Sequence, residues 1–248
     1  MPAVVKATRS RQNQRERVYL HIRRALMSGA YEPGQRVTVA SLSSALGVSG
    51  MPVREALRLL AAERALEIQP SRSATVPRLS RVEILRVREV RELIEGYAAA
   101  QAVQRITPPE LEEVTQLQIA AAAARSRHDG KAILRYNEEF HFKIYEAARI
   151  PTLVDVIAVL WLHSAPTMNI LFLPDYIHRY PDRIQNKNNE ALVRALRAGD
   201  SDGAAQAVRS EIATGSKLID EIMREIDWDG ADDASPLFDQ KRPRRPRK

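Results

Sequence analysis

The chain contains no cysteine, which excludes a disulfide framework, a cysteine-based zinc site and a thiol nucleophile. Its first residues are polar and include no apolar stretch of the kind that a secretion signal needs. No apolar run is recognised as long enough to span a bilayer. We therefore expect a cytoplasmic protein without a membrane partner.

Two motifs of common enzyme classes are also missing. The sequence has no H-E-x-x-H pair of zinc ligands and no Gly-rich loop that could cradle nucleotide phosphates. These absences argue against a metalloprotease and against a nucleotide-dependent enzyme.

Charge is distributed unevenly along the 248 residues. Residues 1–80 hold 13 Lys and Arg against 5 Asp and Glu, whereas residues 81–240 hold 19 against 26. Residues 241–248 hold 6 Lys and Arg and no acidic residue. A basic N-terminal part followed by an acidic remainder is the charge distribution expected when only the N-terminal part binds nucleic acid.

Residues 38–63 have the pattern of a helix-turn-helix. Apolar residues recur at helical spacing on both sides of a turn, at Val39, Leu42 and Leu46 and then at Val53, Leu57 and Leu60. Gly47 is suited to end the first helix and Ser49 to begin the second. Because the apolar face of the second helix turns inward, Arg54 and Arg58 face outward, where they can enter a major groove.

A helix from Arg15 to Ser28 precedes this motif, and two extended runs follow it at residues 66–69 and 74–76. The two runs predict a β-hairpin wing with Arg72 at its tip, beside the DNA backbone or minor groove. The sequence thus predicts a winged helix-turn-helix domain over residues 14–77. Residues 1–13 are polar and without periodicity, so we expect a disordered basic arm.

Beyond a linker at residues 78–80, the chain is helical by its periodicity. Six helices are expected, at residues 81–105, 108–128, 129–149, 152–171, 181–198 and 201–224. Short connections predict that they form an all-α antiparallel bundle over residues 81–226. The tail at residues 227–248 is rich in Asp, Pro and Arg and is expected to be disordered. The fold class is therefore mainly α.

The first part resembles the GntR family of bacterial winged-helix transcription regulators. The resemblance rests on Pro33-Gly34, Gly47-Val48-Ser49 and Pro52-Val53-Arg54-Glu55-Ala56-Leu57. The helical part, with Glu89-Val90-Arg91, Glu95 and Arg197-Ala198-Gly199-Asp200, resembles the FCD effector domain of the FadR subfamily. The resemblance implies a homodimer that binds a pseudo-palindromic DNA operator and responds to a small-molecule effector.

The resemblance also implies that Ser49 and Arg54 contact DNA. The chain departs from the family at Gly50 and Met51, where Arg and Thr are usual, which suggests an altered operator. The outward geometry of the second helix and of the wing adds two arginines. The predicted DNA-binding residues are Ser49, Gly50, Met51, Arg54, Arg58 and Arg72.

FCD domains often hold a divalent metal on one Asp and three His. The corresponding positions here are Asn137, His141, Asn189 and Glu211. Asn is a weak ligand, so this set is degenerate and we expect no metal or other cofactor. The same four side chains would instead hydrogen-bond an effector directly, with Arg91 pairing with its carboxylate. Two alternatives to effector binding stay open. Arg91 can form a salt bridge with Glu95, and His141 can be a hydrogen-bonded residue of the core.

These patterns favour a ligand-responsive transcription regulator, a repressor of a catabolic operon that a small, carboxylate-type effector releases from DNA. We do not expect an enzyme. Two alternatives are a metal-dependent all-α enzyme that uses His141 and Glu211, and an architectural DNA binder without a ligand.

Overall fold

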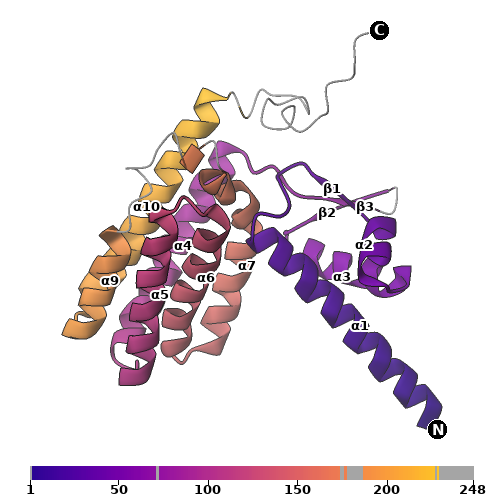
Figure 1. Cartoon of the computed structure of the whole chain (residues 1–248), viewed down its shortest axis with the longest axis horizontal. Helices are drawn as coiled ribbons and strands as arrows, with labels where there is room; N and C mark the ends of the chain where they lie inside the picture. Colours follow the sequence, from indigo (N-terminus) through magenta and orange to yellow (C-terminus); the bar gives the residue numbers. More distant parts are fainter. Residues whose placement is uncertain (1, 71–72, 174–175, 178–186, 227, 229–248) are drawn as a thin grey trace.

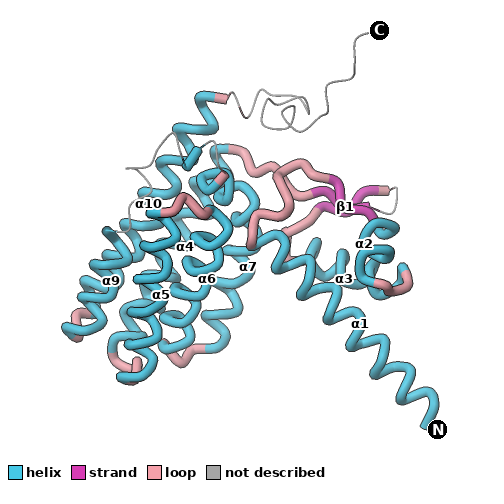
Figure 2. Tube along the Cα trace, in the orientation of Figure 1, coloured by secondary structure: helices cyan, strands magenta, loops and turns pink. Residues whose placement is uncertain are grey.

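A computed structural model of the chain describes residues 2–70, 73–173, 176–177, 187–226 and 228, with side chains from residue 13 onward. Figure 1 shows a small N-terminal part that holds the three strands, set beside a bundle of helices. In Figure 2 helices dominate and the strands are confined to the N-terminal part. The predicted fold class, mainly α with a winged helix-turn-helix and a helical bundle, is confirmed.

The N-terminal part forms a helix-turn-helix with the predicted boundaries. Its elements are α1 (Pro2–Met27), β1 (Arg36–Thr38), α2 (Val39–Leu46), α3 (Gly50–Ala62), β2 (Glu67–Gln69) and β3 (Ser73–Thr75). Gly47 ends α2 in the left-handed conformation, with φ of 62°. Ser49 occupies the N-cap position of α3, but its side chain makes no capping hydrogen bond.

Helix α1 corrects the prediction of an irregular arm at residues 1–13. The helix begins at Pro2 instead of near Arg15. Proline is tolerated in the first turn of a helix, and residues 3–27 contain neither Pro nor Gly. Polar composition suggested disorder, but nothing in the backbone preferences interrupts a helix that Val18 and Ile22 anchor to the core.

The wing is part of a three-stranded antiparallel sheet with strand order β1-β3-β2. Ala74 of β3 lies opposite both Val37 of β1 and Ile68 of β2. The sequence predicted the hairpin of β2 and β3 but not β1, because β1 leads directly into α2 and its partner strand β3 lies far along the chain. Arg72, the predicted wing tip, lies outside the described residues.

The bundle is built from α4 (Arg81–Val103), α5 (Pro108–Ser126), α6 (Gly130–Ala147), α7 (Pro151–Met168), η1 (Asn169–Phe172), α9 (Lys187–Ala198) and α10 (Ser201–Glu225). Ser80 and Glu83 form a capping box at the start of α4, and Asp129 accepts a hydrogen bond from Ala132 N at the start of α6. Helix α10 packs against α4 and α9, and α5 packs against α6.

Trp228 corrects the prediction for the start of the tail. Its side chain is buried, and its indole Nε1 donates a hydrogen bond of 2.9 Å to the carbonyl oxygen of Leu79 in the linker. The guanidinium of Arg78 lies 4.6 Å from the centre of the Trp228 ring. The linker is therefore held against the end of α10; residue 227 and residues 229–248 lie outside the described part.

Helix α7 together with η1, from Pro151 to Phe172, is long and apolar enough to cross a membrane by length and composition alone. This finding corrects our reading of the sequence as having no such run. Half of that apolar window is buried inside the protein, and Ile157 and Leu162 belong to the hydrophobic core. A helix in the centre of a bundle has the same composition as a membrane span, so the feature is explained by packing.

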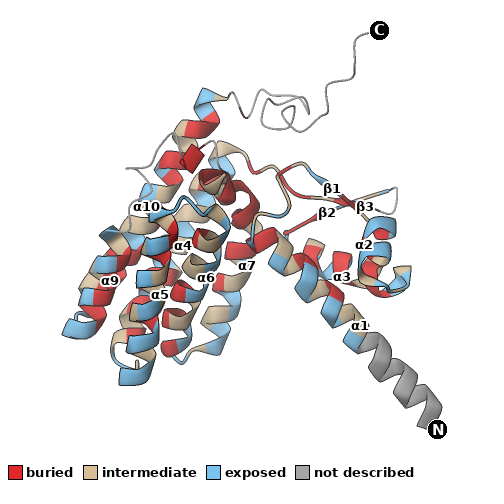
Figure 3. Cartoon of the chain, viewed as in Figure 1, coloured by how far each residue is buried: buried red, intermediate tan, exposed pale blue. Residues whose placement is uncertain are grey.

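One hydrophobic core joins the two parts. Figure 3 shows the buried residues along the faces that the helices turn toward one another. The same cluster of contacting side chains includes Leu26 of α1, Leu57 of α3 and Leu162 of α7. Helix α3 is thus connected to the bundle through α1 by continuous packing.

Candidate functional site

The outer surface of α3 presents the residues that we predicted to contact DNA. Met51 is 55 % exposed, Arg58 is exposed, and Arg54 is half-buried. The inward face of the same helix, which includes Val53 and Leu57, is fully buried. The helix therefore separates a packing face from a polar face, as a recognition helix must.

Gly50 allows Arg54 to lie close to the start of α3. A Cβ atom added at Gly50 would lie 3.5 Å from Arg54 Nη1 and 3.2 Å from Val39 Cγ1. A side chain at position 50 would therefore press on Val39 of α2 and would be in ordinary contact with the Arg54 guanidinium.

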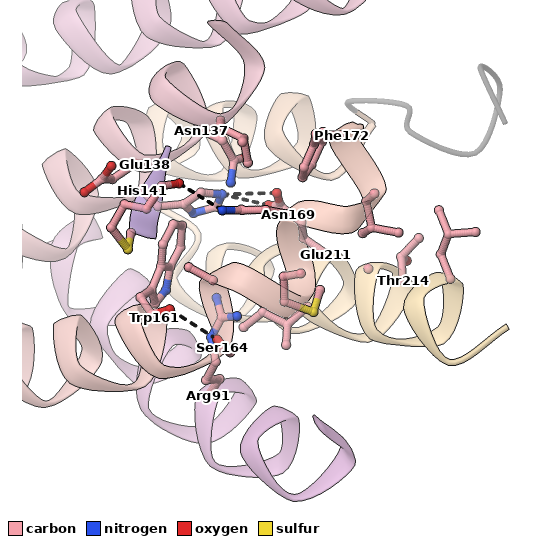
Figure 4. A pocket seen from close by; sticks show the side chains of 18 of the residues that line it. Arg91, Asn137, Glu138, His141, Trp161, Ser164, Asn169, Phe172, Glu211 and Thr214 are labelled. Carbon is pink, nitrogen blue, oxygen red and sulfur yellow. Dashed lines mark hydrogen bonds and ion pairs between the residues drawn. The ribbon is translucent and has the colours of Figure 1, made fainter. Parts of the chain in front are cut away.

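The bundle encloses a cavity of about 150 Å³ near the joint with the N-terminal part. Figure 4 shows most of its side chains, and the lining residues come from α4, α5, α6, α7, η1, α9, α10 and the end of α1. The wall includes Met27, Arg91, Glu95, Arg125, Asn137, Glu138, His141, Trp161, Asn169 and Glu211. Four of the five predicted effector-binding residues thus line one cavity: Arg91, Asn137, His141 and Glu211.

Asn189 does not line this cavity. It is buried, at 1 % exposure, whereas its neighbour Asn188 is in the cavity wall. Sequence spacing placed Asn189 on the right helix, but a step of one residue turns a side chain by about 100° around a helix axis. The predicted place of Asn189 in the cavity wall is therefore corrected, and effector binding by the other four residues stays a prediction.

Arg91 is engaged by its own helix. Its Nε lies 2.5 Å from Glu95 Oε1, its Nη2 lies 3.3 Å from Glu95 Oε2, and its guanidinium stacks 4.9 Å from the centre of the Trp161 ring. Glu95 is completely buried and also accepts a hydrogen bond of 2.7 Å from the Tyr145 hydroxyl. The salt-bridge alternative for Arg91 is the arrangement present.

His141 lies between Tyr145 and Glu211. Its Nδ1 is 3.2 Å from the Tyr145 hydroxyl, and its Nε2 is 3.1 Å from each carboxylate oxygen of Glu211. Burial opposes the ionisation of Glu211, but His141, Arg125 and other neighbouring charges outweigh burial and hold the pKa of this carboxyl below its usual value. Figure 4 shows the pair inside the cavity.

His141 faces oxygen partners at both ring nitrogens. Burial, and then Glu95, raise the pKa of Tyr145 well above its usual value, so the phenol keeps its single proton and donates it to Glu95. The Tyr145 oxygen then faces Nδ1 of His141, and the Glu211 carboxylate faces Nε2.

His141 fits a metal site poorly, because each of its ring nitrogens already faces a hydrogen-bond partner inside the protein. Its two companions at the predicted positions that face the cavity are Asn137, a weak ligand, and Glu211, which is paired with His141 itself. Within the described part of the chain, no three His, Cys, Asp or Glu side chains are grouped so that they could hold a metal ion.

Four of the side chains that line the cavity were not predicted from the sequence. Trp161 and Asn169 belong to apolar helical turns, Arg125 to an alanine-rich helix, and Met27 to the first domain. None stands in a motif, and they meet only because several helices converge. The spacing of apolar residues in α5 did not predict that the Arg125 side chain would line a cavity.

The cavity touches the N-terminal part directly. Asn169 Nδ2 donates hydrogen bonds of 3.1 and 3.2 Å to the carbonyl oxygens of Leu26 and Met27, the last residues of α1. Asn169 and Met27 both line the cavity. A second contact, from His163 Nδ1 to the carbonyl oxygen of Arg64 at 2.8 Å, ties α7 to the turn after α3.

Comparison with known proteins matches both parts. Residues 14–76 match the model of bacterial regulatory proteins of the gntR family, and residues 86–214 match the FCD domain. The HTH-type transcriptional regulator McbR of Escherichia coli is 31 % identical over 182 residues, which cover 73 % of this chain and 81 % of that protein. The gluconate operon transcriptional repressor of Bacillus subtilis is 23 % identical, over 74 % of this chain and 76 % of its own length.

Solved structures agree with this assignment. The structure of E. coli McbR/YncC superimposes with a TM-score of 0.78 at 27 % identity and covers 84 % of this chain and 98 % of that one. A putative GntR regulator from Rhodococcus shares the fold, with a TM-score of 0.68 over 84 % of this chain and 97 % of that one. An exposed recognition helix, a cavity in the helical domain and these matches lead to one conclusion: the chain belongs to the GntR family of DNA-binding transcription regulators, in the FadR subfamily whose members carry an FCD effector domain.

Proposed function

We propose that this protein is a homodimeric, cytoplasmic repressor that a small molecule bound in the helical domain releases from a pseudo-palindromic operator. The observation that carries the proposal is the position of the cavity. Its wall includes Met27 and Asn169, and Asn169 holds the end of α1 by two hydrogen bonds. Helix α1 packs in turn against α3, the recognition helix.

Release from the operator would result from a shift in the equilibrium between two positions of α1 relative to the bundle. An effector that competes for the amide of Asn169, or displaces Met27, favours a placement in which the two recognition helices no longer match successive major grooves. Glu138, another residue of the cavity wall, interacts electrostatically with Arg23 and Arg24 on α1, which adds a second link. Thermodynamic linkage then requires that operator and effector weaken each other equally.

We propose that the effector binds without a metal or other cofactor. Asn137 is a weak ligand, and His141 and Glu211 are bonded to each other, which leaves the donor set of the family's metal site incomplete. A catalytic role is not proposed, because His141 is held at both nitrogens and has none left to act as a base.

A homodimer is supported by an apolar face of α4. Val82, Val90, Leu93 and Tyr97 are 47–66 % exposed and fall on one side of the helix, opposite the side that packs on α10. A stripe of large apolar side chains on an otherwise charged helix is suited to packing against its own copy in a second molecule.

Replacing Leu93 by Asp should therefore convert the dimer to a monomer, because two carboxylates would be buried in a symmetric contact. Sedimentation equilibrium measures the change. Ile119→Asp, on the 51 % exposed surface of α5, is the matched control and should leave the dimer intact. A Leu93→Asp protein that remains dimeric would place the dimer contact elsewhere.

The experiment that tests the function starts from a pool of random duplexes. Selection with the full chain should enrich one sequence with two related half-sites, and the affinity for it should exceed that for random duplex by at least ~10³-fold. Small carboxylates are then titrated into the protein–operator complex. We expect at least one of them to lower operator affinity, by the ~5–150-fold that is typical of coupled sites.

The variant Asn169→Ala separates operator binding from regulation. It should still select the same operator, since Asn169 bonds to the end of α1 and is not part of the exposed face of α3, but effector binding should no longer weaken the complex. Failure to enrich any sequence would contradict the regulator itself. Unchanged antagonism in Asn169→Ala would contradict only the route through α1.

A further inference from the structure

Arg125 is a cation in the cavity wall with two unused donor atoms. It lies in the last turn of α5 and lines the cavity together with His141 and Glu211. The side chain is half-buried, but its Nε and Nη1 atoms are inaccessible to bulk solvent and have no hydrogen-bond partner within the described part of the chain. Buried guanidinium donors are normally satisfied, so these two are unusual.

The other charged groups of the cavity wall already have partners. Arg91 is paired with Glu95, and Glu211 is paired with His141. Glu138 interacts with Arg23 and Arg24 of α1, and in Figure 4 its carboxylate points away from the His141–Glu211 pair. Arg125 interacts with Glu211 through the electric field, and its Nε and Nη1 form no hydrogen bond within the described part of the chain. Two donors of a cation are therefore left without an acceptor in the cavity.

We propose that Arg125 is the residue that selects the effector, by donating hydrogen bonds from Nε and Nη1 to a small anion in the cavity. This inference rests on the proposed function, because it assumes that the cavity is the effector site. The sequence assigned the anion-binding role to Arg91. The inference assigns it to Arg125 instead, which lies on α5, a helix without a family motif.

Two further observations support this assignment. Burial lowers the pKa of Arg125, and only Glu211 opposes that change, as expected for a cation that lacks its counterion. The cavity volume of about 150 Å³ equals that of an apolar cavity known to admit benzene. The side chains beside Arg125 therefore leave room for a small monocarboxylate and not for a nucleotide or a long acyl chain.

The test uses the full-length protein and three carboxylates, acetate, butyrate and benzoate, each paired with its neutral amide. Binding is followed by tryptophan fluorescence, since Trp161 lines the cavity and is one of only two tryptophans. We expect at least one carboxylate to bind and its amide to bind at least ~10-fold more weakly, the ratio expected when a charge-assisted hydrogen bond is lost.

The variant Arg125→Met keeps the length and the apolar stem of the side chain but removes the charge. It should lose the preference for the carboxylate over the amide. It should also melt at a higher temperature than the wild type without ligand, because an uncompensated buried charge is removed. Arg127→Met, two residues later at an exposed position, is the matched control and should change neither property.

Three outcomes would overturn the assignment: no carboxylate binds the wild type, Arg125→Met keeps the preference, or Arg125→Met melts below the wild type. The last result would mean that Arg125 stabilises the fold in its own right. Operator binding is measured separately. A carboxylate that binds through Arg125 yet leaves operator affinity unchanged would contradict the proposed release from DNA and leave the anion site standing.

Discussion

Replacing Glu95 by Gln is expected to lower the free energy of unfolding by about 3–5 kcal/mol, the usual cost of breaking one side of a buried ion pair. Glu95 is completely buried and accepts hydrogen bonds from both Arg91 and Tyr145. The amide keeps the shape of the side chain but leaves the Arg91 guanidinium without a counterion. The loss should extend to His141, whose Nδ1 contacts the Tyr145 hydroxyl.

Thermal unfolding measures this change, and the melting temperature should fall by about 6–20 °C for a chain of this size. Glu92→Gln is the matched control on the same helix. Glu92 pairs with Arg88 at 3.2 Å, but both side chains are more than a quarter exposed, so the loss should stay within about 1 kcal/mol. Equal effects of the two substitutions would show that the buried network does not stabilise the bundle.

Replacing Arg54 by Ala is expected to weaken binding to the selected operator by ~1–3 kcal/mol, about 5- to 150-fold, and to relax sequence preference at one base pair in each half-site. The reason is that Arg54 lies near the start of α3, the part of a recognition helix that reaches base edges. Fluorescence anisotropy with labelled operator duplexes, each altered at one position, measures both quantities.

Arg58→Ala provides the comparison. Arg58 is exposed one turn further along α3, where a phosphate contact is expected. Its loss should weaken binding to all duplexes alike and reduce the salt dependence, without changing base preference. If Arg54→Ala behaves in this uniform way, Arg54 does not read a base.

The N-terminal domain was largely predictable because its signals are local. Gly47 in the left-handed conformation and the apolar spacing of α2 and α3 act within a few residues, so the sequence alone placed the helix-turn-helix. The capping residues Ser80 and Asp129 likewise belong to the helices that they begin. The short strand β1 and the early start of α1 were missed because neither has a periodic apolar pattern.

The cavity was predictable only in part. His141 and Glu211 were found because they stand at positions that a family motif fixes, and they lie 3.1 Å apart. Asn189 was misplaced by a single residue of rotation around α9. Arg91 turned out to be paired within its own helix, an outcome that the sequence had left open.

By itself, the sequence determined that a basic winged helix-turn-helix precedes an acidic helical bundle, because turn residues, capping and helical periodicity are properties of neighbouring residues. Only the tertiary structure decided which charges are compensated. It brought Arg125 from α5 beside the His141–Glu211 pair, and it set Asn169 against the end of α1. These contacts join residues from different helices, and their energies depend on burial and distance, which no local pattern encodes.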